Sequence, residues 1–342
     1  MSLENQENDL SLLYTEAIHI ELGLDLISLG VNKSESLLSS LPKIRRILAQ
    51  EMGLQIPPVK LQDNRDIPFH QYCIHIRGNE MASGELYMDK VLAVAMDLEL
   101  PQLQGIATKD PTFGVNSFWI PPEAEETAII SGYAVVTPLV VLNTHIQETF
   151  RRHADLIFDY SAFELYLEQA TSSSSMLEKA CKEKSTVIFS VLKRLLAEGI
   201  SIRDQQSILE VIVSSEYTDV DTLTSLVRRQ LRYQIRERVT DSDGVHALVF
   251  SEELLHFFEE KQDTESPLST SLKQQLSSEI SIIREKIHHC ELVILCPEKL
   301  RNSLRFISKM LFVPILCREE LPEDTVIHEE EIITIVLPNQ LG

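Results

Sequence analysis

The segment GYAVVTPLVVLNTHIQETFRRHADLIF, from Gly132 to Phe158, predicts a short strand that passes directly into a long helix. Residues 133–136 suit a strand, whereas Thr137 and Pro138 are residue types that favour a helix N-cap and the first helical position. Apolar side chains then recur at helical spacing. The predicted buried face comprises Leu139, Leu142, Ile146, Phe150, His153 and Ile157.

An aromatic segment, KDPTFGVNSFWI, stands just before this region at residues 109–120 and holds the only Trp of the chain. Phe113, Phe118 and Trp119 surround a glycine, and they follow an Asp-Pro dipeptide of the kind that forms turns. The residues alone leave two interpretations open. Either one loop turns its aromatic rings into the core, or the segment forms a surface pocket to which a partner binds.

The N-terminal part of the chain is predicted to contain one helix followed by four strands. The helix covers residues 34–53, with Leu41, Ile44 and Leu48 on one face and Gly53 as its left-handed stop. The strands are expected in residues 54–64, in residues 71–88 as a hairpin turned at Gly78-Asn79, and in residues 90–96. Two prolines predict that the first of these strands lies at a sheet edge or leads into one. A short helix is also expected from Pro122 to Ser131, ended by Gly132.

The C-terminal half changes from helices to alternating strands and helices. The predicted helices of the first region are residues 163–170, 176–198, 204–214 and 222–235. Beyond them, strands are expected at residues 246–250, 291–296, 313–317 and 332–337, separated by helices at 252–261, before His288 and at 298–311. This alternation indicates an α/β unit with a partly parallel sheet.

The charge balance excludes several classes of function. Asp and Glu number 52 against 31 Lys and Arg, giving a net charge of -21, so the surface repels nucleic-acid phosphates and anionic lipid headgroups. No run of about 18 apolar residues is present, and the start of the chain lacks the features of a signal peptide. The five cysteines are scattered and odd in number, which fits a reducing compartment.

Motifs for nucleotide, acyl-transfer and metal chemistry are missing or weak. The sequence contains neither glycine-rich phosphate motif and no G-x-S-x-G elbow. His288, His289, Cys290 and Cys296 invite a zinc interpretation, but their spacing matches no standard site, and the two cysteines would lie at opposite ends of a strand. We therefore favour buried cysteines and helix-end histidines, and we predict no metal, no cofactor and no catalytic residue.

Two further groups of polar residues each allow two interpretations. Asp110 and His145 could form an acid–base pair, but no nucleophile or oxyanion donor accompanies them, and a turn residue and a satisfied buried histidine explain them equally well. Arg228, Arg232 and Arg236 recur at helical i, i+4 spacing. This basic stripe is either a solvated helix face or a contact surface for an acidic neighbour.

The order and spacing of several segments resemble one protein family. These segments are AIHIELGLDLISL, IRRILAQEMGLQIPPVKLQDN, KDPTFGVNSFWI, the Gly132–Phe158 stretch and LLAEGISIRDQQSILEVI. Together they resemble the cytoplasmic domain of the large export-gate protein of bacterial type III secretion systems and the flagellum, from about residue 15 to residue 240. The injectisome branch is favoured. Under this resemblance the chain is a piece of an inner-membrane protein whose membrane half is absent, and the piece faces the cytoplasm.

The resemblance implies a multi-subdomain fold of mixed α+β and α/β type. A polar linker covers residues 1–15, and a discontinuous α/β first subdomain covers residues 16–88 and 138–157. A small α/β second subdomain, residues 89–137, is inserted into it. A helical third subdomain at residues 158–237 carries the ring contacts, and an α/β fourth subdomain covers residues 238–342.

The resemblance also implies partners and site residues. The family's docking site for chaperone–substrate complexes corresponds here to Asp110, Phe113 and Thr144, through the motif Asp-Pro-x-Phe-Gly and a Thr-His pair on the long helix. Phe118 and Trp119 are assigned to the core beneath. The family forms a ring of nine copies, and Arg228, Arg232 and Arg236 are our candidates for its interface.

The sequence thus predicts a non-enzymatic ring and docking platform of an export gate. It would bind chaperone–substrate complexes, a gatekeeper and other export-apparatus proteins, pass substrates to the export channel, and serve virulence. Two alternatives belong to other classes. One is a small-molecule hydrolase that uses Asp110 and His145, and the other is an RNA-binding module, against which the net charge of -21 argues.

Overall fold

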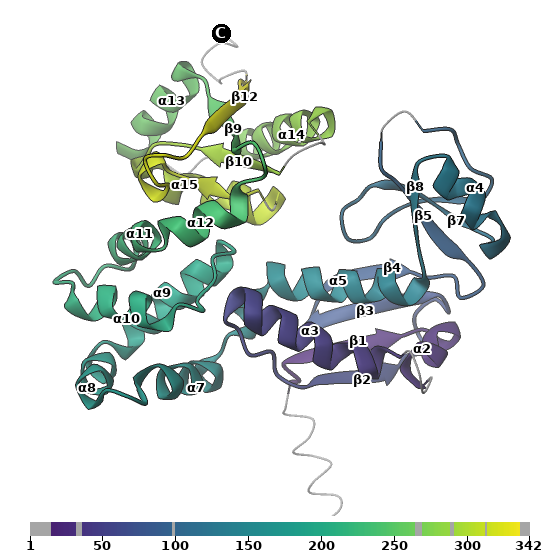
Figure 1. Cartoon of the computed structure of the whole chain (residues 1–342), viewed down its shortest axis with the longest axis horizontal. Coiled ribbons are helices and arrows are strands. Elements are labelled where there is room, and N and C mark those ends of the chain that lie inside the picture. Colours follow the sequence, from purple (N-terminus) through teal and green to yellow (C-terminus); the bar gives the residue numbers. More distant parts are fainter. Residues whose placement is uncertain are drawn as a thin grey trace, which may run out of the picture. The chain divides into compact units, whose positions relative to one another are not determined.

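The computed structural model describes residues 15–31, 36–97, 100–263, 269–287, 291–311 and 313–335 (Figure 1). The chain divides into two compact units, Met1–Asp159 and Tyr160–Gly342. Mixed α and β structure is present in both units, as predicted for the fold class. Within the described residues, no helix combines the length and the apolar character needed to cross a membrane.

The first sheet of the N-terminal unit has four strands in the order β2-β1-β3-β4. Its strands are β1 (Ile18–Leu22), β2 (Val59–Asp63), β3 (Gln71–Ile76) and β4 (Asn79–Glu85). β1 pairs with β2 in parallel and with β3 in the antiparallel sense. The edge position predicted for the strand after Pro57 and Pro58 is confirmed by the place of β2.

The hairpin of β3 and β4 turns one residue earlier than predicted. Arg77 and Gly78, with φ of 51° and 77°, both occupy the left-handed region. A two-residue turn with positive φ at both positions matches the twist of the adjoining strands, which explains why these two residues form it. The guanidinium of Arg77 donates to Asp159 at 2.9 Å and to the carbonyl of Leu156 at 3.1 Å.

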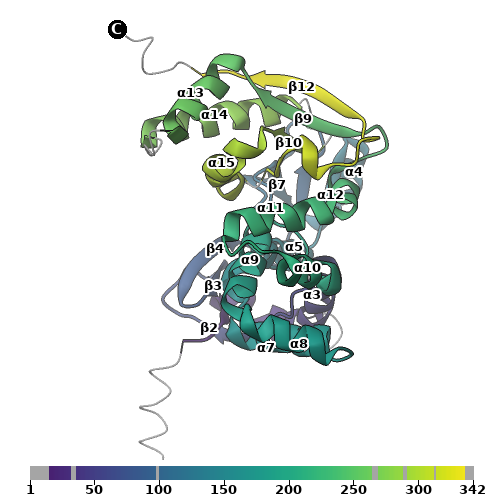
Figure 2. The same cartoon turned by 90° about the vertical axis from the view of Figure 1, so that its left-hand side faces the viewer.

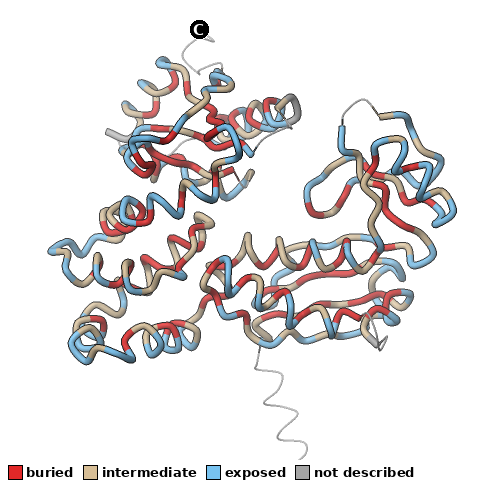
Figure 3. The backbone as a smooth tube through the Cα atoms, in the orientation of Figure 1, coloured by how far each residue is buried: buried red, intermediate tan, exposed pale blue. Residues whose placement is uncertain are grey.

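Two long helices cover one side of this sheet, and both agree with the sequence prediction. α3 (Leu37–Met52) begins at Ser36, which caps it, and ends at Gly53 with φ of 70°. α5 (Pro138–Arg152) begins after Thr137 and continues into the short α6 (Ala154–Ile157). Figures 1 and 2 show α3 and α5 on the same side of the sheet, and buried positions recur along both helices in Figure 3. A 3₁₀ turn (Leu24–Leu26) and α2 (Ile27–Val31) link β1 to this layer.

A second, fully antiparallel sheet is inserted between β4 and α5, in the order β6-β7-β5-β8. Its elements are β5 (Val91–Ala95), β6 (Ile106–Lys109), β7 (Asn116–Ile120), a 3₁₀ turn (Pro122–Ala124), α4 (Glu125–Ile130) and β8 (Tyr133–Val136). Sequence analysis predicted β5, β8 and the short helix but missed the hairpin of β6 and β7. Trp119 of β7 is 2% exposed, and Phe118 is partly buried against the small core, so both core assignments hold.

The C-terminal unit begins with six helices. They are α7 (Tyr160–Thr171), α8 (Ser175–Glu183), α9 (Ser185–Ala197), α10 (Gln205–Ser214), α11 (Val220–Gln230) and α12 (Arg232–Val239). Two predicted continuous helices are each divided in the structure. One is interrupted at Lys184 and the other at Leu231, where the backbone leaves the regular helical geometry.

The unit ends in a sheet in which all strand pairs are parallel, in the order β11-β10-β9-β12. Its elements are β9 (Val245–Phe250), α13 (Glu252–Asp263), α14 (Thr270–Lys286), β10 (Leu292–Leu295), α15 (Glu298–Leu311), β11 (Ile315–Leu316), a 3₁₀ turn (Arg318–Glu320) and β12 (Ile327–Ile333). The last strand begins earlier than the predicted residues 332–337. His288, His289 and Cys290 of the zinc hypothesis lie outside the described residues. The four described cysteines are free and buried.

Candidate docking site

The motif Asp110–Gly114 forms the tight turn between β6 and β7. The backbone N–H of Asp110 donates to the carbonyl of Val115 at 2.8 Å, and that of Gly114 donates to the carbonyl of Asp110 at 2.8 Å. The carboxylate of Asp110 also accepts hydrogen bonds from the N–H groups of Thr112 at 3.0 Å and Phe113 at 2.7 Å. Asp110 is therefore a buried side chain that fixes the turn.

This turn holds Phe113 on the surface. Its side chain is 65% exposed, whereas Trp119 on the following strand is 2% exposed. Gly114 has φ of 71°, a conformation that side chains rarely adopt, so a glycine is needed directly after the exposed ring. The core interpretation is correct for Trp119 and wrong for Phe113, which is an apolar group on a rigid turn.

An arginine at the C-terminal end of α5 holds the turn against that helix. Arg152 donates from Nη2 to the carbonyl of Thr112 at 3.1 Å and from Nε to Glu148 at 3.0 Å. The carboxylate of Glu148 thereby orients the guanidinium toward the turn. Sequence analysis did not identify Arg152, because nothing in its spacing from the motif indicates that the chain brings them together.

His145 and Tyr72 form a buried hydrogen bond beneath this region. Nδ1 of His145 lies 2.6 Å from the hydroxyl of Tyr72, which belongs to β3. Burial, with the positive charge of Arg152, lowers the pKa of His145 to about 4. Burial and the nearby carboxylate of Asp110 raise the pKa of Tyr72 above its ordinary value. The imidazole is therefore neutral near pH 7, as expected for a satisfied interior histidine.

The acid–base hypothesis does not fit this arrangement. Among the described residues, no hydrogen bond links Asp110 to His145, because the carboxylate binds backbone N–H groups of its own turn and the imidazole binds Tyr72. Both groups thus have structural partners.

Thr144 is exposed on α5, and it precedes the buried His145 by one position. Adjacent helical residues are separated by about 100° around the axis, which accounts for the difference in burial. Asn143 donates from Nδ2 to Oγ of Ser40 at 3.0 Å and so links α5 to α3.

The basic stripe does not exist as a continuous surface. Arg228 is 1% exposed, and its guanidinium donates to Glu320 and to Glu198 within the same unit. The prediction of Arg228 as an interface residue is wrong because these carboxylates, distant in the sequence, bury it. Since the helix is interrupted at Leu231, Arg232 belongs to a separate helix, on which it is exposed.

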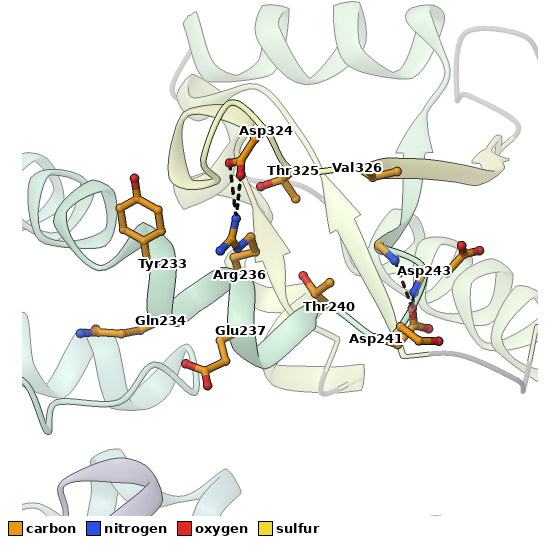
Figure 4. Close-up of a pocket in the computed structure, with 12 residues that line it drawn as sticks. Tyr233, Gln234, Arg236, Glu237, Thr240, Asp241, Asp243, Asp324, Thr325 and Val326 are labelled. Carbon is orange, nitrogen blue, oxygen red and sulfur yellow. Dashed lines mark hydrogen bonds and ion pairs between the residues drawn. The ribbon is translucent and has the colours of Figure 1, made fainter.

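Arg236 lines an open pocket of about 670 Å³ in the C-terminal unit (Figure 4). It contacts Asp324 at 3.3 Å, and the two side chains point toward each other in Figure 4. The other acidic residues that line the pocket are Glu237, Asp241 and Asp243. Arg236 is half-buried and retains part of its surface for another contact.

Comparison with known proteins identifies similar sequences across most of the chain. The sequence model of the FHIPEP family matches residues 2–326. Flagellar biosynthesis protein FlhA of Bacillus subtilis (strain 168) is 31% identical over 353 residues, covering 97% of this chain and 52% of the relative. The chain spans about half the length of the curated relatives it matches.

Several solved structures share the fold. The nonameric EscV cytosolic domain from the type III secretion system aligns with a TM-score of 0.73 and 16% identity, covering 94% of this chain and 97% of that one. The Chlamydia pneumoniae CdsV and CdsO protein complex contains a chain that aligns with a TM-score of 0.73 and 19% identity, covering 92% of this chain and 97% of that one.

Proposed function

The chain belongs to the FHIPEP family, and from this premise we propose that it is the cytoplasmic ring and docking platform of a type III secretion export gate. The resemblance stated from its motifs is confirmed by the family match. The proposed task is to bind chaperone–substrate complexes and to pass substrates toward the export channel. No catalytic step is part of this proposal.

The turn between β6 and β7 is the observation that carries the docking proposal. Hydration of an exposed aromatic ring is unfavourable, so covering the ring with a partner lowers the free energy. Aromatic anchors of this kind dominate the energetics of protein interfaces. Phe113 is 65% exposed, and four hydrogen bonds hold the surrounding backbone in place. Such a ring loses little conformational freedom when a partner covers it.

The three docking residues have different roles in this proposal. Phe113 contacts the partner through its ring, and Thr144 offers a hydroxyl that can donate or accept a hydrogen bond. Asp110 acts through the turn, because its carboxylate is buried and already accepts two hydrogen bonds. Replacement of Asp110 should therefore displace Phe113 rather than remove a direct contact.

Self-association is the second part of the proposal. The EscV cytosolic domain is nonameric, and we propose that this chain also forms a ring, with Arg232 and Arg236 contributing to the contacts between copies. The four-subdomain division predicted from the sequence remains part of this proposal, with residues 158–237 carrying most of the ring contacts.

Further partners and the location follow from the same premise. CdsV forms a complex with CdsO, and we propose that this chain likewise contacts other export-apparatus proteins, a gatekeeper among them. We also propose that the full-length protein is anchored in the bacterial inner membrane with this piece in the cytoplasm. Assignment to the injectisome branch, and hence to virulence, belongs to the proposal as well.

An export assay in living bacteria tests the platform. Phe113→Ala in the full-length protein should reduce cargo in the medium by about tenfold or more, since a loss of 1.4 kcal/mol in binding is a factor of ten. Ile130→Ala is the matched control, because Ile130 is 80% exposed on α4 of the same inserted sheet region. Equal export by both variants and the wild type would refute the docking role.

A further inference from the structure

A group of metal-binding side chain types lies in the first sheet of the N-terminal unit. Cys73 and His75 belong to β3 and Glu80 belongs to β4, and one donor atom of each lies within 4.8 Å of the others. A thiolate, an imidazole and a carboxylate are the donors with which proteins bind zinc. The donors of a tetrahedral zinc site lie about 3.3–3.7 Å apart, so no pair of the three needs to approach by more than about 1.5 Å.

Strand geometry places these side chains on the side of the sheet opposite the helices. Tyr72 points toward α5, because its hydroxyl is bonded to His145. Since successive residues of a strand point to opposite faces, Cys73 and His75 point away from α3 and α5. The group therefore lies apart from the helix-side hydrogen bond of the docking region.

A β-bulge brings Glu80 into the group. The register between β3 and β4 shifts after Ile74, so that His75 pairs with Glu80, whereas an uninterrupted ladder would pair it with Met81. Directly paired residues of antiparallel strands share a face, so the bulge places a carboxylate beside the imidazole instead of a thioether. Bulges re-aim side chains in this way and are frequent next to functional sites.

The neighbouring strand β1 adds a carboxylate and a second imidazole. The register pairs Glu21 with Cys73 and His19 with His75. Oε2 of Glu21 lies 3.6 Å from Nε2 of His75, a separation found between two donors of one tetrahedral ion, and it also accepts a hydrogen bond from Nδ2 of Asn64 at 2.7 Å. Nε2 of His19 and of His75 are buried, and neither has a hydrogen-bond partner among the described residues.

The electrostatic environment favours a cation. Cys73 is buried, and the carboxylates of Glu80 and Glu21 bring negative charge near its sulfur. Lys60 on β2 is the positive group that acts on His19, and it already lies 3.5 Å from Glu16. Buried polar groups, such as an imidazole with carboxylates beside it, normally form hydrogen bonds or bind a metal ion.

We propose that Cys73, His75, Glu80 and Glu21 form a zinc site on the outer face of this sheet. Binding displaces the thiol proton of Cys73 to solvent, so that the sulfur joins the ion as thiolate, while the imidazole and the two carboxylates bind through lone pairs. The ion would connect β1, β3 and β4, the three strands that carry its ligands. The site has no part in docking, and its role is to stabilise the sheet.

Cobalt(II) is the probe that tests the site directly, because a thiolate ligand gives it a near-ultraviolet charge-transfer band and tetrahedral geometry gives it visible bands. The reduced 342-residue chain should show both on titration with cobalt, and one equivalent of zinc should remove them. Cys73→Ser should lose the charge-transfer band. Glu80→Gln should weaken binding by at least about tenfold, the size of effect known from groups that support metal ligands.

Matched controls keep the outcome unambiguous. Glu80 is exposed, so Glu80→Gln is expected to fold, and Glu85→Gln on the same strand removes another exposed carboxylate that is not part of the group. Cys181→Ser replaces another buried thiol, and Cys290→Ser removes a thiol that the sequence places beside two histidines. The three controls, Glu85→Gln, Cys181→Ser and Cys290→Ser, should bind cobalt as the wild type does.

The opposite results would overturn the assignment. Absence of cobalt bands in the wild-type chain would show that no such site forms. Bands that persist in Cys73→Ser and disappear in Cys290→Ser would place the metal at the other cysteine. Equal affinity of Glu80→Gln and Glu85→Gln would exclude the carboxylate supplied by the bulge.

Discussion

Arg228 and Glu320 form a two-point ion pair inside the C-terminal unit. Nε and Nη2 of the guanidinium each donate to one carboxylate oxygen at 2.6 Å, and both residues are at most 1% exposed. Glu198 and Arg301 extend this pair into a network that joins α9 and α11 to α15 and to the turn before β12. Burial raises the pKa of Glu320, but Arg228 and Arg301 outweigh it, so the pKa lies below the ordinary value.

Removal of one partner from this network should destabilise the chain strongly. We expect Glu320→Gln to reduce the free energy of unfolding by about 3–5 kcal/mol, because Arg228 is left buried without its main counter-charge. Urea titration followed by circular dichroism measures the change. Glu298→Gln is the control, since its pair with Arg229 is partly exposed and should contribute less than about 1 kcal/mol. Equal stability of the two variants would contradict the network.

The pKa of His145 predicts a loss of stability on acidification. Because burial lowers this pKa from 6.5 to about 4, the unfolded state takes up a proton at a pH at which the folded state does not. Stability from this group is present above pH 6.5 and falls as the pH decreases toward 4. Between pH 7.5 and pH 5, the wild type should lose about 2 kcal/mol more than His145→Gln, measured by urea unfolding. Parallel losses in both proteins would refute the shift.

Gly114 should be intolerant of a side chain for reasons of backbone conformation alone. A Cβ added at this position would have no atom within 4 Å, but φ is 71°, so Gly114→Ala should cost about 1 kcal/mol of stability. Gly30→Ala is the control, because Gly30 in α2 also has open space and does not have positive φ. That variant should be neutral or stabilising by up to about 1 kcal/mol. The same cost at both positions would show that left-handed backbone is not the cause.

Charge reversal on α12 tests the proposed contacts between copies. Arg232→Glu should weaken self-association of the chain at high concentration, because Arg232 is exposed and we place it at the interface. Sedimentation velocity measures the change. Arg65→Glu, at an exposed position after β2 and outside residues 158–237, is the control. If both variants associate like the wild type, α12 does not belong to the interface.

The elements that the sequence predicted correctly are those with strong local signals. α3 and α5 each have a periodic apolar face and capping residues, and β2 has prolines that keep it at the edge. The hairpin of β6 and β7 was missed, because β6 is short and mostly exposed and has no alternating pattern. No glycine or proline marks the interruption at Leu231, which therefore depends on packing rather than on local sequence.

The local structure of the candidate site was predicted in part. The motif Asp110–Gly114 indicated a turn, and the resemblance singled out Phe113. The exposure of Phe113 is known only from the structure. The burial of Arg228 could not be predicted, because its partner Glu320 is 92 residues away in the sequence. In the same way, Cys73 and His75 are two residues apart, but only the bulge in β4 reveals that Glu80 joins them.

The docking role of Phe113 is best measured by a calorimetric titration of a chaperone–cargo complex onto this chain, as wild type and as Phe113→Ala. Circular dichroism first establishes that both are folded, which the 65% exposure of Phe113 leads us to expect. We predict a loss of about 1–3 kcal/mol of binding free energy in Phe113→Ala and none in Ile130→Ala. Equal affinity of Phe113→Ala and the wild type would contradict the assignment of this turn as the docking anchor.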